Sequence, residues 1–479
     1  MWAAALIVAG IGAYIMYDAL PGVNWGIWTA FASVGLIVTM RTRRALNSST
    51  LLMLATATVL AAGSSVTADP LIDALICISV ILFLGLAMLL SVDPGLDRIT
   101  AGLVISAPFI AFANALAASF MRVSDLSHVV RSGRARAAVR GTVITIPVVL
   151  VFALLLSNAD PVFAGWRDEV WRIIETWSFI PRTVFFFALL TVTLGAYSFA
   201  ALKPLALSSP LPGPGAGSPN RWLGATERLI LLSGVAALFW LFIGVQLSYL
   251  FGNAPSLPGS GITFAEYARR GFGELTIVAT CSVILILMTE RYGQTDGYGG
   301  RLRTLTIALL IAVLIILVSA FHRVSLYEAA YGYTVSRLYA QVYMLVVAAA
   351  LIALAVGVLG TLDIGVLFRR VFVVAVSAFL ILVFWNHEAW IASANIDRVA
   401  TTGKLDARYI ARDLSPNAIP VIVTRLPSLP DPLRSELHGQ LVARYGTRRR
   451  LPPGRWFEWN LRREQAREAL ARIGLPRAP

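Results

Sequence analysis

The residue types best suited to chemistry gather in a short polar stretch between two long apolar runs. Within ITFAEYARRGFGEL, the residues Glu266, Arg269, Arg270 and Glu274 fall inside nine consecutive positions. Thr263 followed three residues later by Glu266 is the pattern of a capping box, so we expect a short helix to begin here. On that helix Arg270 lies four residues from both glutamates, the spacing at which helix side chains meet.

Two interpretations of this stretch stay open. Opposite charges at these spacings neutralise one another on a surface helix that simply joins two membrane spans. Alternatively, the charges form a polar site at one membrane face, because ionisable groups beside a bilayer are costly unless they pair or meet water.

A second polar stretch, FHRVSLYEAAYGYTVSRLY at 321–339, carries Arg323, Glu328 and Arg337 among several tyrosines. Tyrosines at span ends are typical of the interfacial belt of membrane proteins. The arginines also suit an anionic headgroup, sugar or peptide, because arginine makes planar, bidentate contacts with phosphate and carboxylate. Asp160 precedes a proline at a predicted span end and is either a turn residue or a carboxylate at a cavity mouth. The candidate polar site comprises Asp160, Glu266, Arg269, Arg270, Glu274, Arg323, Glu328 and Arg337.

The elements that hold these residues are predicted to be membrane helices. Of the 479 residues, 57% are hydrophobic and 14% are charged, against about 25% charged in an ordinary soluble chain. Apolar runs of about 20 residues, long enough to cross a bilayer, recur along the sequence. We expect an all-α polytopic transmembrane helical bundle of about twelve spans, at 2–17, 24–40, 51–67, 71–91, 99–121, 138–157, 181–201, 228–251, 274–290, 304–321, 337–360 and 368–386.

A small C-terminal helical domain is expected after the last span. Ser415-Pro416 and Asp431-Pro432 each place a capping residue before a first-turn proline, so helices are expected to begin there. A last helix is expected at about 456–473. The predicted regions are N-terminal membrane spans at 1–136, a membrane core at 137–386 and a basic helical domain at 387–479.

Orientation follows from the short basic loops. The formal net charge is +14, and basic loops are typically cytoplasmic, which places the turn at 322–336 and the C-terminal domain outside. The arginines at 41–44 also favour the cytoplasm, yet three candidate spans separate them from the arginine-rich loop at 122–140. One of the three is therefore not a full crossing, or the first basic loop is external. The predicted partners are the lipid bilayer, its anionic lipids and a partner membrane protein, with no nucleic acid.

Several classes of chemistry lack their sequence signals. The four histidines, His128, His322, His387 and His438, are scattered, and no paired cysteine spacing accompanies them, so no metal site is expected. No phosphate-binding P-loop and no nucleophile elbow occur. We therefore predict no cofactor.

Long ordered segments resemble a known family. These are LLLSNADPVF, ITFAEYARRGFGEL, RVSLYEAAYGYTVSRLYAQVYM and, in the tail, NIDRVATTGKLDARYIARDLSPNAIPVI. They resemble DUF4173, a family of bacterial membrane proteins of unknown function that is close to DUF4153, over about 140–475. The resemblance implies a bacterial inner-membrane protein, and the family has no established activity to carry over.

Three function classes remain open. The first is a non-enzymatic membrane protein that transports or senses at an outer-face polar site. The second is an enzyme that acts on a lipid-linked substrate, with Glu266 or Asp160 as its base. The third is a membrane scaffold or assembly protein with a basic tail.

Overall fold

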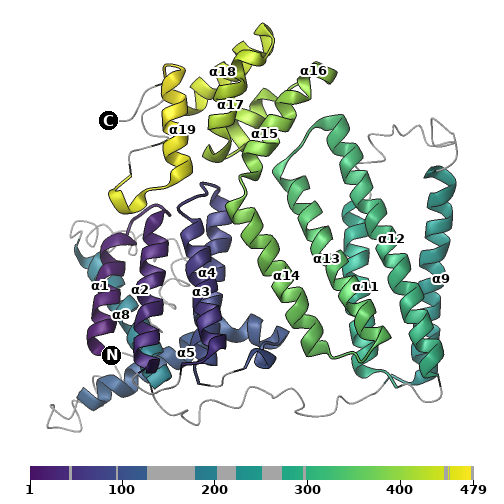
Figure 1. Ribbon diagram of the computed structural model, residues 1–479, viewed down its shortest axis with the longest axis horizontal. Helices are drawn as coiled ribbons and strands as arrows, with labels where there is room; N and C mark the ends of the chain where they lie inside the picture. Colours follow the sequence, from purple (N-terminus) through teal and green to yellow (C-terminus); the bar gives the residue numbers. More distant parts are fainter. Residues whose placement is uncertain are drawn as a thin grey trace, which may run out of the picture. The chain divides into compact units, whose positions relative to one another are not determined.

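Helices account for most of the residues that the computed structural model describes, and short turns connect them (Figure 1). The described residues are 1–41, 46–92, 95–126, 179–201, 223–250, 272–294, 298–446, 451 and 454–475. Within these ranges β-pairing is limited to one isolated bridge between Leu223 and Gly293. The expected all-α class is confirmed for this part of the chain.

Two compact units make up the chain. Unit 1 comprises Met1–Leu211 and Pro453–Glu464, and unit 2 comprises Pro212–Pro452 and Gln465–Pro479. The division into 1–136, 137–386 and 387–479 stays a prediction.

Unit 1 is built from apolar helices and one returning piece of the tail. Its helices are α1 (Trp2–Ile15), α2 (Val23–Arg41), α3 (Ser48–Gly63), α4 (Pro70–Leu90), η1 (Leu96–Arg98), α5 (Ala101–Leu126), α8 (Phe179–Ala201), η6 (Trp456–Glu458) and the start of α19 (Leu461–Arg472). Asn47 and Asp69 cap α3 and α4 by accepting from Thr50 N and Leu71 N. A Cβ on Gly195 would lie 1.9 Å from Ala115 O, so glycine is what lets α8 approach α5 so closely.

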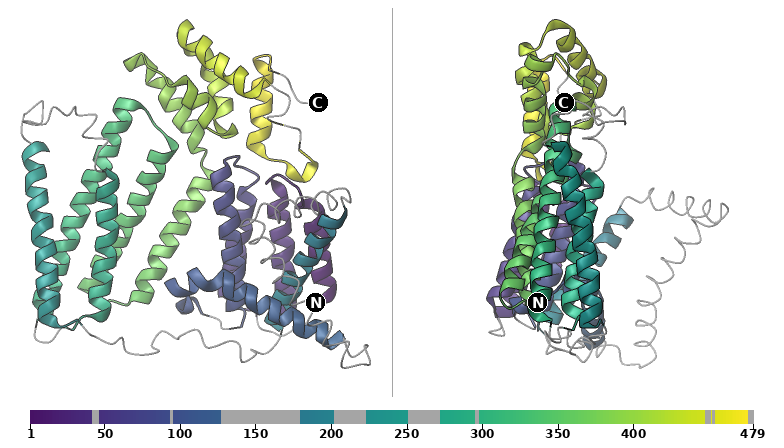
Figure 2. Two further views of the ribbon diagram at one scale, coloured as in Figure 1. Left: turned by 180° about the vertical axis from the view of Figure 1, so that it is seen from behind. Right: turned by 90° about the vertical axis from the view of Figure 1, so that its right-hand side faces the viewer.

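The angle of α5 bears on the topology of unit 1. Figures 1 and 2 show α5 at a steep angle to α3 and α4, whereas α3 and α4 run alongside each other. Of the three candidate spans after Arg41, α4 and α5 are long and apolar enough to cross a membrane, whereas α3 is a shorter apolar helix. Both topologies that the basic loops allow stay predictions.

Unit 2 begins with five long helices. These are α9 (Ala225–Leu250), α11 (Phe272–Tyr292), α12 (Gly299–Tyr331), α13 (Val335–Leu359) and α14 (Ile364–Phe384). Their shared core includes Leu232, Leu309, Ile316 and Leu354, all of which are buried. Near one end of this group, Arg228 and Glu290 form an ion pair between α9 and α11.

Short helices complete unit 2. They are α15 (His387–Asp397), α16 (Val399–Thr402), η3 (Tyr409–Asp413), η4 (Pro416–Ala418), α17 (Ile419–Arg425), η5 (Leu426–Ser428), α18 (Asp431–Tyr445) and the rest of α19. Their apolar core includes Ile391, Ile419 and Leu437. The buried carboxylate of Glu388 accepts hydrogen bonds from Ser415 N and Asn417 Nδ2, each at 2.8 Å.

Most of the expected elements coincide with helices, with some corrections. Nine helices in the described ranges are long and apolar enough to cross a membrane, while α1 and α3 are shorter apolar helices. The expected span at 138–157 lies outside the described residues, and the count of twelve stays a prediction. Ser415 caps η4 as expected. A helix also begins at Asp431 as expected, but the capping role of Asp431 is wrong, because Asp431 is the first residue of α18, Pro430 holds the cap position and no side chain caps the helix. The helix expected from 456 is wrong at its start, because α19 begins at Leu461 after a separate turn.

Candidate functional site

Half of the predicted polar site falls outside the described residues. These residues are Asp160, Glu266, Arg269 and Arg270. Glu274 is exposed in the first turn of α11. The first polar stretch therefore stays a prediction. The side-chain geometry described below is that of the second polar stretch, at 321–339.

Arg323, Glu328 and Arg337 lie on consecutive helices. Arg323 and Glu328 are buried toward the end of α12, and Arg337 is half-buried in the first turn of α13. Glu328 Oε2 accepts a hydrogen bond from Gln341 Nε2 at 2.8 Å, which ties α12 to α13. The second polar stretch is therefore a helix end, a tight turn and a helix start.

The turn between α12 and α13 requires glycine. Gly332 has φ +91°, a conformation that costs L side chains energy. A Cβ there would also lie 2.5 Å from Asn395 Oδ1 and 2.9 Å from Arg398 Nη1. The backbone of this turn thus lies directly against α15 and the residue that follows it.

Asn395 and Arg398 fasten the turn to α15. Asn395 Oδ1 accepts from Tyr333 N and its Nδ2 donates to Tyr333 O, both at 2.8 Å. Arg398 donates to Ala329 O at 3.1 Å and to Ala330 O at 2.7 Å. These are carbonyls of the last turn of α12, which lack helical partners and carry the negative end of the helix dipole.

A cavity of about 220 Å³ lies beside this turn, and we name it the helix-end pocket. Its polar lining consists of tyrosines, cationic side chains and single threonine, asparagine and aspartate residues. The lining residues are Tyr327, Tyr331, Tyr333, Thr334, Arg337, Asn395, Arg398, Lys404, Leu405, Asp406, Tyr409 and Ile410.

Two aromatic residues set the walls of the helix-end pocket. The Arg337 guanidinium lies 4.0 Å from the centre of the Tyr327 ring, in a cation–π contact, and donates to Gly332 O. Tyr409 Oη accepts from Val335 N at 2.8 Å. Burial raises the pKa of Tyr409 to about 12, so its hydroxyl stays neutral and keeps a proton to donate.

The charge balance of the pocket favours an anion. Arg337, Arg398 and Lys404 contribute three positive charges and Asp406 one negative charge, which leaves a balance of +2. One oxygen of Asp406 accepts from Tyr409 N at 2.9 Å, as a local cap. A concave site with excess positive charge and hydroxyl groups suits a phosphate or carboxylate.

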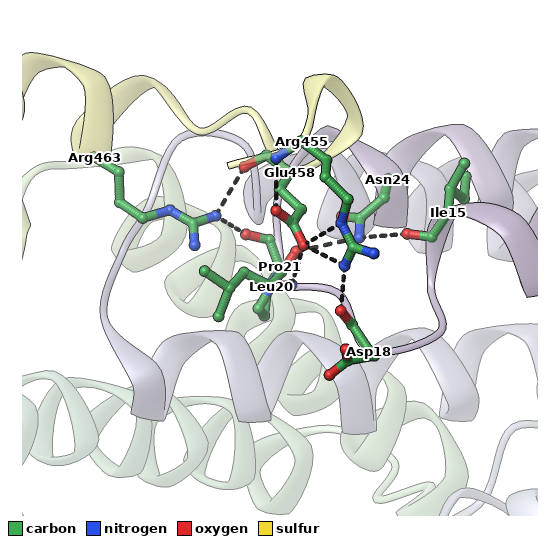
Figure 3. Close-up of polar contacts among 8 residues, drawn as sticks. All are labelled: Ile15, Asp18, Leu20, Pro21, Asn24, Arg455, Glu458 and Arg463. Atoms are coloured by element: carbon green, nitrogen blue, oxygen red, sulfur yellow. Dashed lines mark hydrogen bonds and ion pairs between the residues drawn. The ribbon is translucent and has the colours of Figure 1, made fainter. Parts of the chain in front are cut away.

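Unit 1 holds a second polar cluster, made by residues 454–464, which we name the tail clasp (Figure 3). Glu458 is its centre. Its Oε1 accepts from Leu20 N at 3.1 Å and from Arg455 Nε at 3.0 Å, and its Oε2 accepts from Arg455 N at 2.7 Å. Burial acts to raise the pKa of Glu458, but these hydrogen bonds and the Arg455 charge outweigh it, and the pKa lies below its ordinary value.

The tail clasp joins two loops of unit 1. Arg463 donates to Pro21 O in the α1–α2 loop (Figure 3). Val23 N, at the end of the same loop, donates to Trp459 O at 3.0 Å. Asn460 Nδ2 donates to Ser64 O at 2.7 Å, which binds the α3–α4 loop. Asn460 Oδ1 accepts from Arg463 N at 3.0 Å, and this hydrogen bond caps the start of α19.

This cap explains why the last helix begins at Leu461 and not at the expected residue 456. Trp459 has ψ 132°, which is not helical, so the turn η6 ends there and α19 begins at Leu461, after the cap residue Asn460. An asparagine ahead of a helical run is a signal for a helix start. That signal was available in the sequence, whereas the partner loops of Glu458 and Asn460 carry no sequence pattern.

The apolar helices define the class of this protein, which is a multi-pass membrane protein. Within that class, the chain belongs to the family described as a domain of unknown function, DUF4153, which matches residues 4–424. The related name DUF4173, suggested by the sequence segments, is not the one that matches. A search of curated proteins finds no significant match, and a search of solved structures finds none either. The helix-end pocket lies inside the matched residues, and the tail clasp lies beyond them.

Proposed function

We propose that this membrane protein is a non-enzymatic sensor that binds a small anionic ligand in the helix-end pocket. The observation that carries the proposal is the lining of that pocket, in which three cationic side chains and four tyrosines surround the cavity with a single carboxylate. A volume of about 220 Å³ is below the range of roughly 300–1,000 Å³ typical of drug-sized ligands. A phosphate, a small carboxylate or one lipid headgroup matches that size.

The position of the pocket favours sensing over transport. The α12 helix has 33 residues and is therefore about 50 Å long, well beyond the roughly 30 Å of a hydrocarbon core. Its apolar part ends near Phe321, and Tyr327 follows six residues later, about 9 Å along the axis. A pocket at that level opens to water or headgroups, whereas a transport site is expected near the bilayer midplane.

The proposed side of the membrane is the outer one. The α11–α12 and α13–α14 connections lie at the opposite ends of these helices from the pocket, and the chain bears arginines there. They are Arg291, Arg301, Arg303, Arg369 and Arg370. The positive-inside rule makes that end cytoplasmic and supports an extracytoplasmic pocket and C-terminal helices, in a bacterial inner membrane.

Binding of defined anions to the full chain in nanodiscs tests the proposal. Calorimetric titration with inorganic phosphate, glycerol 3-phosphate and succinate should give saturable binding to at least one of them. Lys404→Gln removes an exposed cation from the pocket, and it should weaken that binding by about tenfold, the effect of one charge-assisted contact.

Arg408→Gln is the matched control, because Arg408 is exposed on the same segment and does not line the cavity. It should leave the affinity unchanged. Absence of saturable binding to all three anions, or equal weakening by both substitutions, would overturn the proposed function.

A further inference from the structure

The aromatic side chains of the segment 456–459 lie in two environments. Trp456 is 64% exposed and Trp459 is 46% exposed, whereas Phe457 between them is 3% exposed. Phe457 packs against the ring of Tyr14, with 5.6 Å between ring centres. Exposure of large apolar side chains to water is unfavourable, so two exposed tryptophans on a hydrogen-bonded turn indicate a contact surface.

The tail clasp fixes these tryptophans at a defined level of unit 1. It bonds to Asp18 O and Pro21 O in the α1–α2 loop and to Ser64 O and Ser65 O in the α3–α4 loop. Those loops directly follow the apolar helices α1 and α3 and precede α2 and α4. The clasp therefore lies where the apolar helices end, which is the level of the lipid headgroups for helices that span a bilayer.

We propose that the tail clasp is an interfacial anchor that places Trp456 and Trp459 in the lipid headgroup layer. Tryptophan concentrates at this level because its ring is apolar while its N–H needs a polar partner. Exposed apolar side chains of unit 1 accompany the two tryptophans, namely Leu20 at 44% and Tyr14 at 58% exposure.

The hydrogen bonds of the clasp make this anchor rigid. Glu458, Asn460 and Arg463 hold the turn from the inside, so the outward tryptophans are set in place before they meet lipid. The anchor is independent of the helix-end pocket, because every residue it uses belongs to unit 1.

Depth-dependent quenching tests the anchor. Single cysteines at Trp456, Trp459 and, separately, Leu20 are introduced into a full-length Cys77→Ala, Cys281→Ala chain and labelled with the fluorophore NBD. The chain is reconstituted in vesicles of phosphatidylethanolamine and phosphatidylglycerol that contain lipids with a quencher either near the headgroup or near the acyl-chain end. Leu20→Cys leaves both tryptophans in place, so the test does not depend on their removal.

Headgroup-level quencher should reduce the emission at 456, 459 and 20 by at least twice as much as the deep quencher does. A label at Ser435→Cys, on the exposed side of α18, is the water-exposed reference and should respond to aqueous iodide alone. The proposal is overturned if iodide quenches positions 456 and 459 as strongly as 435. It is equally overturned if neither quencher reaches them, since that result would assign the surface to a second copy of this chain.

Discussion

The helix-end pocket and the tail clasp both join tail residues to turns between apolar helices. They differ in charge balance, because the clasp pairs its central carboxylate within the protein and the pocket has an excess of positive charge. In the clasp, the carboxylate of Glu458 receives donors from Arg455 and Leu20, so its hydrogen-bonding capacity is used within the protein. In the pocket, three cationic side chains and one carboxylate line an open cavity, and Arg337 and Arg398 also donate to backbone carbonyls of the adjoining turn. A saturated cluster stabilises the fold, whereas an unbalanced one retains capacity for a ligand.

The largest expected effect is a loss of unfolding free energy when the tail clasp is disrupted, with anion binding at the helix-end pocket retained. Glu458→Ala removes the carboxylate that accepts from Arg455 and from the backbone N–H of Leu20, which should cost about 2–3 kcal/mol of unfolding free energy. Thermal unfolding in nanodiscs measures the loss, and anion binding at the helix-end pocket should persist. Glu468→Gln, at an exposed position of α19, is the control with no expected change. Equal stability of Glu458→Ala and the wild type would contradict a structural role for the clasp.

The next largest effect is expected on the stability and anion affinity of the helix-end pocket. Gly332→Ala forces a Cβ into a positive-φ position and against Asn395 Oδ1 at 2.5 Å, with an expected cost of about 1–3 kcal/mol and loss of anion binding. Gly403 also has positive φ, at +62°, but open space surrounds it. Gly403→Ala should therefore cost roughly 1 kcal/mol and leave the affinity intact. Thermal unfolding and titration of the two variants side by side distinguish steric contact from backbone strain.

A smaller effect concerns one hydroxyl. Tyr409→Phe removes the acceptor of Val335 N at the start of α13 and should cost about 1 kcal/mol. Tyr331→Phe, in an exposed tyrosine of the same pocket, provides the comparison and should be neutral for stability. If both variants unfold at the wild-type temperature, the hydrogen bond to Val335 contributes nothing measurable.

The smallest effect is a pH dependence confined to the clasp. The folded-state pKa of Glu458 lies below its ordinary 4.5, so the carboxylate contributes stability above the unfolded-state value and loses it as the pH falls through the folded-state value. The difference in unfolding temperature between the wild type and Glu458→Gln should be constant at neutral pH and shrink below about pH 4.5. A difference that grows on acidification would reverse the assigned sign.

Local composition was enough to predict the apolar helices. Helices such as α4 and α13 follow from the length and hydrophobicity of continuous runs, which need no knowledge of distant residues. Arg337 was also predicted, because it stands next to the tyrosines of its own turn. Arg398, Lys404 and Tyr409 line the pocket but were not among the predicted residues, because they reach it only when the segment 398–409 folds back onto that turn.

The tail clasp shows why the remaining contacts could not be predicted. Glu458 bonds to the backbone N–H of Leu20, and Asn460 bonds to backbone carbonyls of the α3–α4 loop. Backbone groups are identical at every non-proline position, so no residue type marks them as partners. The sequence could indicate that Glu458 needs a partner, and only the folded chain identifies it.

The hydrogen bond between Glu458 and Leu20 N can form only late in synthesis of the chain. Glu458 follows Leu20 by 438 residues, and ribosomes add about 5–20 residues per second. The first four helices therefore wait roughly 20–90 seconds in the membrane before the residues that close their loops are made. During that interval their loop ends stay open to membrane chaperones and proteases, and completion of the tail ends that exposure.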